Sequence, residues 1–172
     1  MPTVRCSKCG EEHDLSRTEP TFWRPDAFFS VPEEARNGRI SHNDDTCLIA
    51  STDGQGLTCF LRTVLDVPIK GESRPIGWGV WVEVTDQVYQ RVNDLWDASN
   101  QSEESPLPCT LANEIPHYPS TRGLPGTIQL TSPTTRPSLV LASDLEHPFA
   151  VEAREGVHFE RSLEWRLWSV HR

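Results

Sequence analysis

Residues 57–68 are the feature that most constrains the fold. Apolar side chains occupy both alternating faces of this segment, with Leu57, Cys59, Leu61 and Leu65 on one face and Phe60 and Val64 on the other. A strand that is apolar on both faces has to be covered on both sides. We therefore expect this segment to be a central strand of a sheet.

The residues around this strand predict a run of strands. Residues 52–56 are rich in Gly and Asp, a turn signal that predicts a hairpin between a strand at 46–51 and the strand at 57–68. Alternating apolar residues predict a further strand at 77–85. Two more strands are expected at 127–131 and 138–142, on either side of a Pro/Thr turn, and residues 98–108 read as a polar loop.

Helices are predicted between and around these strands. Thr85 is an N-cap residue type, and the apolar residues after it recur at helical spacing, which predicts a helix over 86–97. Pro32 and the acids behind it predict a short helix that Asn37–Gly38 would end. At the C-terminal end, residues 148–155 predict a helix stopped by Gly156, and 159–169 predict another.

Strands in the middle with helices at both ends indicate an α+β fold with a mainly antiparallel sheet. The length of 172 residues suits a single domain over 1–172, with residues 1–16 packed on it as a zinc-knuckle segment. There is no run of about 18 apolar residues and no signal-type apolar stretch, so we expect a cytoplasmic protein. Its five cysteines should then stay reduced, as ligands or core residues.

The net charge of −9 disfavours nucleic-acid binding, because an acidic surface repels phosphate. The charge is explained either by solubility alone or by a basic protein partner. No block of like charges is longer than Glu103–Glu104, so the sequence shows no charged tail or patch.

The Cys6–Ser7–Lys8–Cys9–Gly10 knuckle is the strongest chemical signal. Two thiolates at this spacing can bind one tetrahedral zinc ion, and the glycine permits the tight turn. A redox CxxC normally begins a helix after a strand, and the polar residues 11–14 predict no helix. The pattern favours zinc over a redox pair or unmetallated thiols, although a lone CxxC is only half of a site.

The other ligands have to come from scattered residues. His13 follows Cys9 by four residues, and Cys47 begins the first strand of the expected hairpin, so both are candidate ligands. Cys59 lies among apolar residues and is expected to be a core thiol. The location of Cys109 is open. The predicted metal site is thus Cys6, Cys9, Cys47 and His13.

No catalytic template is present, since the sequence has no GxSxG, HExxH, P-loop or dinucleotide motif. This favours a non-catalytic, protein-binding module with a structural zinc, one version being an immunity-type inhibitor of a basic toxin. The alternative is a zinc enzyme with an open metal position. Cys6, Cys9 and Cys47 would then hold the metal with a water, and His13 or Asp14 would serve as the acid–base group.

Several segments beside the knuckle carry a resemblance to a known family. They are 45–49, 60–68, 77–82, 116–121 and 147–152, of which the Trp-Gly-Val-Trp stretch in 77–82 is the most specific. Together they resemble the bacterial domain-of-unknown-function family 2199, over nearly the whole chain. The resemblance implies the placement of the knuckle, His13 and Cys47, but it implies no activity. The chain departs from the family pattern at 117–121, which lacks an acid, and at 50–59, which is longer and richer in Gly.

Overall fold

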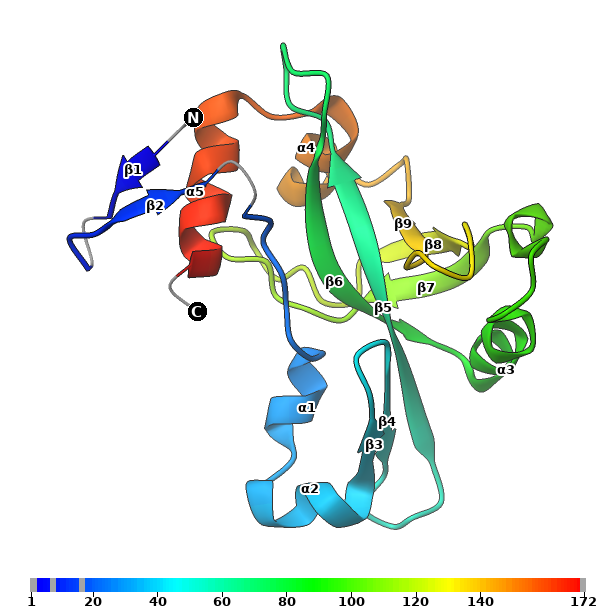
Figure 1. The fold of residues 1–172 in the computed structure, drawn as a ribbon. Helices are drawn as coiled ribbons and strands as arrows, with labels where there is room; N and C mark the ends of the chain where they lie inside the picture. The colour runs from blue at the N-terminus through cyan, green and yellow to red at the C-terminus, as the bar shows by residue number, and fades with distance from the viewer. Residues whose placement is uncertain (1–2, 7–8, 16–17, 171–172) are drawn as a thin grey trace.

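The computed structural model describes residues 3–6, 9–15 and 18–170, and their fold is α+β, as the sequence predicted (Figure 1). The strands are β1 (Thr3–Arg5), β2 (Glu12–Asp14), β3 (Ile40–His42), β4 (Thr46–Ala50), β5 (Leu57–Val67), β6 (Ile76–Val84), β7 (Leu107–Leu111), β8 (Pro125–Gln129) and β9 (Ser138–Leu141). The helices are α1 (Asp26–Ser30), α2 (Glu33–Arg39), α3 (Asp86–Leu95), α4 (Pro148–Glu155) and α5 (Phe159–Val170), with a 3₁₀ turn at Gln101–Glu103. None of the helices in the described ranges is long and apolar enough to span a membrane.

The main sheet closes on itself into a barrel. The sequence predicted a mainly antiparallel sheet and did not predict this closure. Strands β3 to β9 pair in chain order and antiparallel. In addition, β9 pairs parallel with β5, where Val64 lies opposite Ser138. Within the described residues, β5 to β9 therefore form a closed, mixed five-stranded barrel.

Strand β5 is central, as predicted, because it has neighbours on both edges and is covered on both faces. The β4 pairing ends at Leu61, and β9 takes over the same edge of β5 at Val64. Backbone bonds mark the change of partner: Arg62 N donates to Asp45 O at 2.9 Å, and Val64 N donates to Pro137 O at 3.0 Å. We call this place, between β4 and β9, the strand split.

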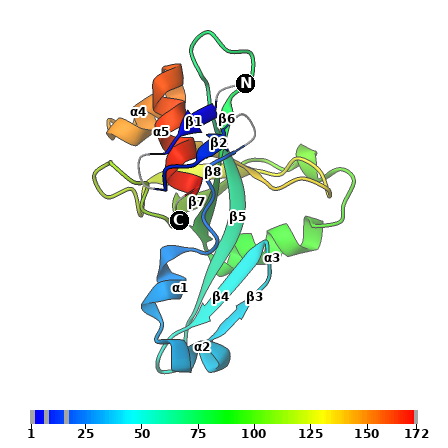
Figure 2. The ribbon, with the colours of Figure 1, turned by 60° about the vertical axis from the view of Figure 1, so that its left-hand side comes forward.

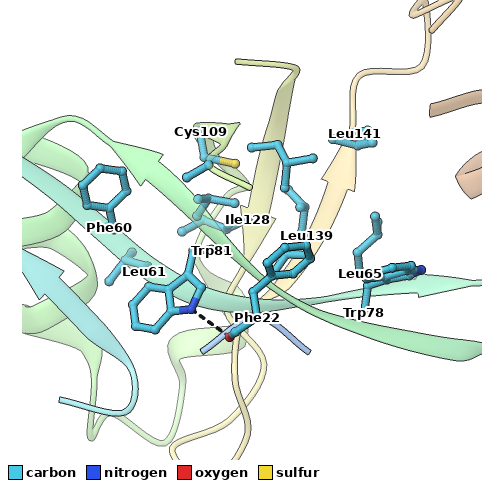
Figure 3. Packing of buried hydrophobic residues seen from close by; sticks show 14 of the residues in the cluster. Phe22, Phe60, Leu61, Leu65, Trp78, Trp81, Cys109, Ile128, Leu139 and Leu141 are labelled. Atoms are coloured by element: carbon cyan, nitrogen blue, oxygen red, sulfur yellow. Dashed lines mark hydrogen bonds between the residues drawn. The ribbon is translucent and has the colours of Figure 1, made fainter. Parts of the chain in front are cut away.

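Buried side chains from the barrel strands and the helices form one hydrophobic cluster (Figure 3). Trp78 on β6 is fully buried, and its ring contacts Phe149 of α4 and Trp165 of α5, with centroid distances of 6.1 and 5.3 Å. Trp81 is also fully buried, and its indole N–H donates to the Phe22 carbonyl at 3.1 Å. Both tryptophans are therefore core residues.

Most predicted helices are confirmed. The Thr85 side chain accepts a hydrogen bond from Val88 N at 3.2 Å and starts α3, and Gly156, with φ 82°, ends α4. The predicted end of α2 was wrong, because the helix continues through Asn37–Gly38 to Arg39. Strand β7 was not predicted, and its first two residues lie inside the segment read as a polar loop.

The N-terminal arm, residues 18–22, runs from the β1–β2 hairpin along α5 to the open edge of β6. Arg166 of α5 donates to the carbonyls of Leu15 and Thr18, at 2.9 and 2.7 Å. Farther along, Phe22 N donates to Gly79 O at 2.8 Å, so that the arm lies parallel to β6. The hairpin is thus attached to α5 and β6, and not to the first strand of the main sheet.

Candidate metal centre

The β1–β2 hairpin positions the two cysteines of the CxxC motif. Its strands pair at Arg5 and Glu12, directly before and after the turn. Two backbone bonds close the turn: Cys6 N donates to Glu11 O at 2.8 Å, and Gly10 N donates to Cys6 O at 2.9 Å. Gly10 has φ +74°, a conformation that a glycine adopts without strain. The Cys-x-x-Cys-Gly pattern therefore folds as the tight turn that its sequence predicted.

His13 on β2 completes a cluster of three candidate metal ligands. The Sγ atoms of Cys6 and Cys9 and a ring nitrogen of His13 all lie within 4.8 Å of one another. Cys9 Sγ and His13 Nε2 lie 3.0 Å apart. In a tetrahedral zinc site the ligand atoms are about 3.3 to 3.8 Å apart, so small side-chain rotations would let all three contact one ion.

The cluster is open to solvent on one side. Cys6 is buried, His13 is half-buried and Cys9 is exposed. Two sulfur ligands and one imidazole form a donor set that suits zinc. A fourth position on the exposed side would be filled by water or by a further ligand.

Cys47, the fourth predicted ligand, lies elsewhere. It is fully buried on β4, where it pairs with Phe60, and Figures 1 and 2 place β4 and the hairpin at opposite ends of the molecule. Burial raises the pKa of Cys47 to about 11, although the Arg24 charge lowers it, so the thiol stays protonated at neutral pH. The structure does not bring Cys47 to the other three residues, because β4 pairs on the far end of β5 while the hairpin packs beside α5.

The remaining cysteines are core residues. Cys59 is buried on β5, as the sequence predicted, and its pKa is raised by burial. Cys109, whose location the sequence left open, is buried on β7, and burial raises its pKa to about 12. Cys47, Cys59 and Cys109 are free thiols, and none of the three belongs to a metal-type group within the described ranges.

Two other histidines have structural roles. The Nδ1 atom of His147 accepts a hydrogen bond from Phe149 N at 3.2 Å, which makes His147 the N-cap of α4. Its other ring nitrogen therefore carries the proton and donates to Pro119 O at 3.2 Å. The ring of His42 packs edge-on against Phe28, with a centroid distance of 5.4 Å.

The turn around 116–121 is held by a polar cluster that sequence reasoning missed. Glu114 accepts hydrogen bonds from Ser120 Oγ at 2.7 Å and from Thr121 N at 2.8 Å. The side chain of Asn113 is buried and accepts from Trp81 N at 2.8 Å. Because these groups are satisfied by one another, the cluster is structural. Only the polar residues themselves hinted at it, and the partner of Asn113 lies on a strand distant in the sequence.

The comparisons agree with the resemblance seen in the sequence. A family model described as "Uncharacterized protein conserved in bacteria (DUF2199)" matches residues 5–157. The chain belongs to this family. No curated protein and no solved structure matches the chain.

The part of the chain that matches the DUF2199 family begins directly before Cys6 and ends after α4. It therefore includes the hairpin turn, His13 and the whole barrel, whereas α5 lies beyond it. The family description names no activity, so a function can be inferred only from the geometry of the hairpin.

Proposed function

We propose that Cys6, Cys9 and His13 bind one zinc ion whose fourth position is closed by a further protein ligand, and that the protein is a non-catalytic binding module in which this zinc is structural. The observation that carries the proposal is the convergence of the three ligand atoms within 4.8 Å. Thiolate and imidazole ligands favour zinc over the hard cations magnesium and calcium, which prefer oxygen.

The size of the hairpin supports a structural role for the metal. Strands β1 and β2 have three residues each, and a two-stranded hairpin of this length is marginally stable in water. Zinc binding to a site that forms only in the folded state adds its binding free energy to folding. The ion would therefore fix the turn and keep the hairpin beside α5.

A direct test is metal analysis of the purified protein. We expect one zinc per chain, lost in Cys6→Ser, Cys9→Ser and His13→Ala, and retained in Cys47→Ser, the matched control. Zinc affinity should also fall steeply on acidification, by up to about 100-fold per pH unit, because both thiols lose a proton on binding. A protein that takes up no zinc, or that loses it only in Cys47→Ser, would refute the proposal.

The partner in this proposal is a basic protein, since the chain carries a net charge of −9. An immunity-type inhibitor of a basic toxin is one form that such a module takes. A native pull-down should recover a basic partner from the same operon, and binding should weaken with salt. A pull-down that recovers no partner under native, low-salt conditions would count against this part.

The exposed fourth position favours a second candidate function, a zinc enzyme in which water is the fourth ligand. A structural zinc site is closed by four protein ligands, whereas a catalytic site keeps one position open. Cobalt substitution separates the two: adding azide should change the visible spectrum of an open site and leave a closed site unchanged. Asp14, on β2 next to His13, is the acid–base candidate in this alternative.

A further inference from the structure

The strand split holds a cleft that the proposed zinc function does not use. Because β4 leaves β5 after Leu61 and β9 joins only at Val64, the edge of β5 opens between them. A cleft of about 500 Å³ lies there. It is lined by Asp45, Val64, Trp96, Pro133, Thr134, Thr135 and Arg136. Clefts of about 300 to 1,000 Å³ are typical of small-molecule sites.

Arg136 is the basic residue that lines this cleft. Its Nε donates to Asp45 Oδ1 at 2.7 Å, and this ion pair is partly exposed to solvent. Among the described residues this is the only hydrogen bond seen for the Arg136 guanidinium, so its Nη groups remain available for a ligand. An arginine fork matches the oxygens of a phosphate or carboxylate.

Arg62 lies close to this ion pair, and, among the described residues, its guanidinium group has an unsatisfied hydrogen-bond donor. Its Nη1 donates to Asp44 O at 3.4 Å, but its Nε is buried and has no hydrogen-bond partner in the described part of the chain. Burial lowers the pKa of Arg62, and the nearby Arg136 charge lowers it further. Arg24 acts in the same direction, whereas Asp44 and Asp45 oppose it.

Several charged side chains lie close enough to Arg62 to act on it. Three guanidinium groups, those of Arg24, Arg62 and Arg136, act against the carboxylates of Asp44 and Asp45. The rest of the chain is acidic, with a net charge of −9 for the whole protein. A group of arginines in an otherwise acidic protein favours the binding of an anion.

We propose that the cleft at the strand split binds a small organic oxyanion, with its phosphate or carboxylate group at Arg136 and its organic part against Trp96. Arg62 strengthens the attraction through its charge. Thr134 and Thr135 line the same cleft, and their hydroxyl groups hydrogen-bond to Ser132 at 3.2 and 2.8 Å, so a ligand would have to share or replace these bonds. Trp96 is half-buried and supplies an apolar surface beside them.

Calorimetric titration at low salt tests this with three molecules: inorganic phosphate, phenyl phosphate and benzoate. We expect saturable binding, tighter for phenyl phosphate than for inorganic phosphate. The comparison of phenyl phosphate with benzoate shows whether the oxyanion is a phosphate or a carboxylate. Arg136→Gln should weaken binding by about tenfold or more, because it removes a charged hydrogen-bonding partner.

The matched control is Arg122→Gln, which removes an arginine from a different cleft, lined also by Glu83 and Glu114. This variant should bind like the unmodified protein. Trp96→Leu should reduce the affinity for phenyl phosphate while leaving inorganic phosphate unchanged. Since the inference does not depend on zinc, Cys9→Ser should bind the anion normally.

Two results would overturn the inference. One is the absence of saturable binding by all three molecules. The other is an equal loss of affinity in Arg136→Gln and Arg122→Gln, which would mean that the anions sense only the overall charge. Arg136→Gln is a suitable test variant because the Arg136 side chain is partly exposed. Its replacement should therefore leave the unfolding midpoint nearly unchanged.

Discussion

Gly79→Ala should detach the N-terminal arm, residues 18–22, from β6, because the structure leaves no room there for a side chain. A Cβ at Gly79 would lie 2.8 Å from Thr21 Oγ1 and 3.2 Å from Thr21 Cγ2. The arm cannot simply shift away, since Gly79 N donates to Pro20 O at 2.9 Å and Phe22 N donates to Gly79 O at 2.8 Å. Forcing an extra methyl into a packed site costs about 1 to 3 kcal/mol.

Removing the clashing atoms should restore most of that stability. Thr21→Ala deletes Oγ1 and Cγ2 and leaves only the Thr21 Cβ, which a Cβ at Gly79 would approach to 3.3 Å. In this background, Gly79→Ala should cost less than about 1 kcal/mol, so that the two positions couple by about 1 to 2 kcal/mol.

Urea unfolding of the four proteins of this double-mutant cycle measures the coupling. With a urea dependence of about 2 kcal/mol per molar, the Gly79→Ala midpoint should fall by roughly 1 M. Gly38→Ala is the control of opposite sign: its Cβ would meet no atom within 4 Å in α2, so it should stabilise the helix by about 0.5 to 1 kcal/mol. Equal costs of Gly79→Ala in both backgrounds would refute the arrangement of the arm on β6.

Three further outcomes follow from the burial and the hydrogen bonds. Desolvation by burial would raise the pKa of Glu114, but the hydrogen bonds to its carboxylate outweigh this and lower the pKa. The contribution of Glu114 to stability is therefore present above its unfolded-state pKa and is lost as the pH falls through its folded-state pKa. Glu114→Gln should flatten the loss of stability at acid pH, as measured by urea unfolding. A thiol reagent, followed by mass spectrometry, should label the exposed Cys9 fast, and more slowly once zinc is added. Cys47 and Cys109 should react only on unfolding, because both thiols are buried and have raised pKa values. Phe149→Ala should cost about 3 to 5 kcal/mol in denaturant unfolding, because the ring is fully buried against two tryptophans, and a cost under 1 kcal/mol would contradict that packing.

The elements that the sequence predicted well are those governed by local chemistry. Thr85 and the apolar spacing after it were enough to place α3, since a cap and a 3.6-residue period act within a few turns. The two apolar faces of β5 likewise predicted its central position. The turn at Gly10 also followed from the residues alone, because the need for a glycine there is local.

Features that depend on residues far apart in the sequence could not be predicted from the sequence. The barrel closes through the pairing of Val64 with Ser138, and neither residue carries a signal for the other. Cys47 begins a strand, as expected, but its distance from the knuckle depends on which end of β5 that strand joins. The same holds for Asn113, which follows β7 and whose side chain accepts a hydrogen bond from the backbone of Trp81 on β6.

The sharing of one edge of β5 between β4 and β9 has a consequence for synthesis of the chain. Strands β4, β5 and β6 are consecutive and can pair as soon as they have been made, whereas β9 is made much later. Until then, the edge of β5 beyond Leu61 has backbone groups without their final partner, next to apolar side chains. An open apolar edge is a place where nascent chains associate, so the pace of synthesis between β6 and β9 sets how long this chain is exposed to misassembly.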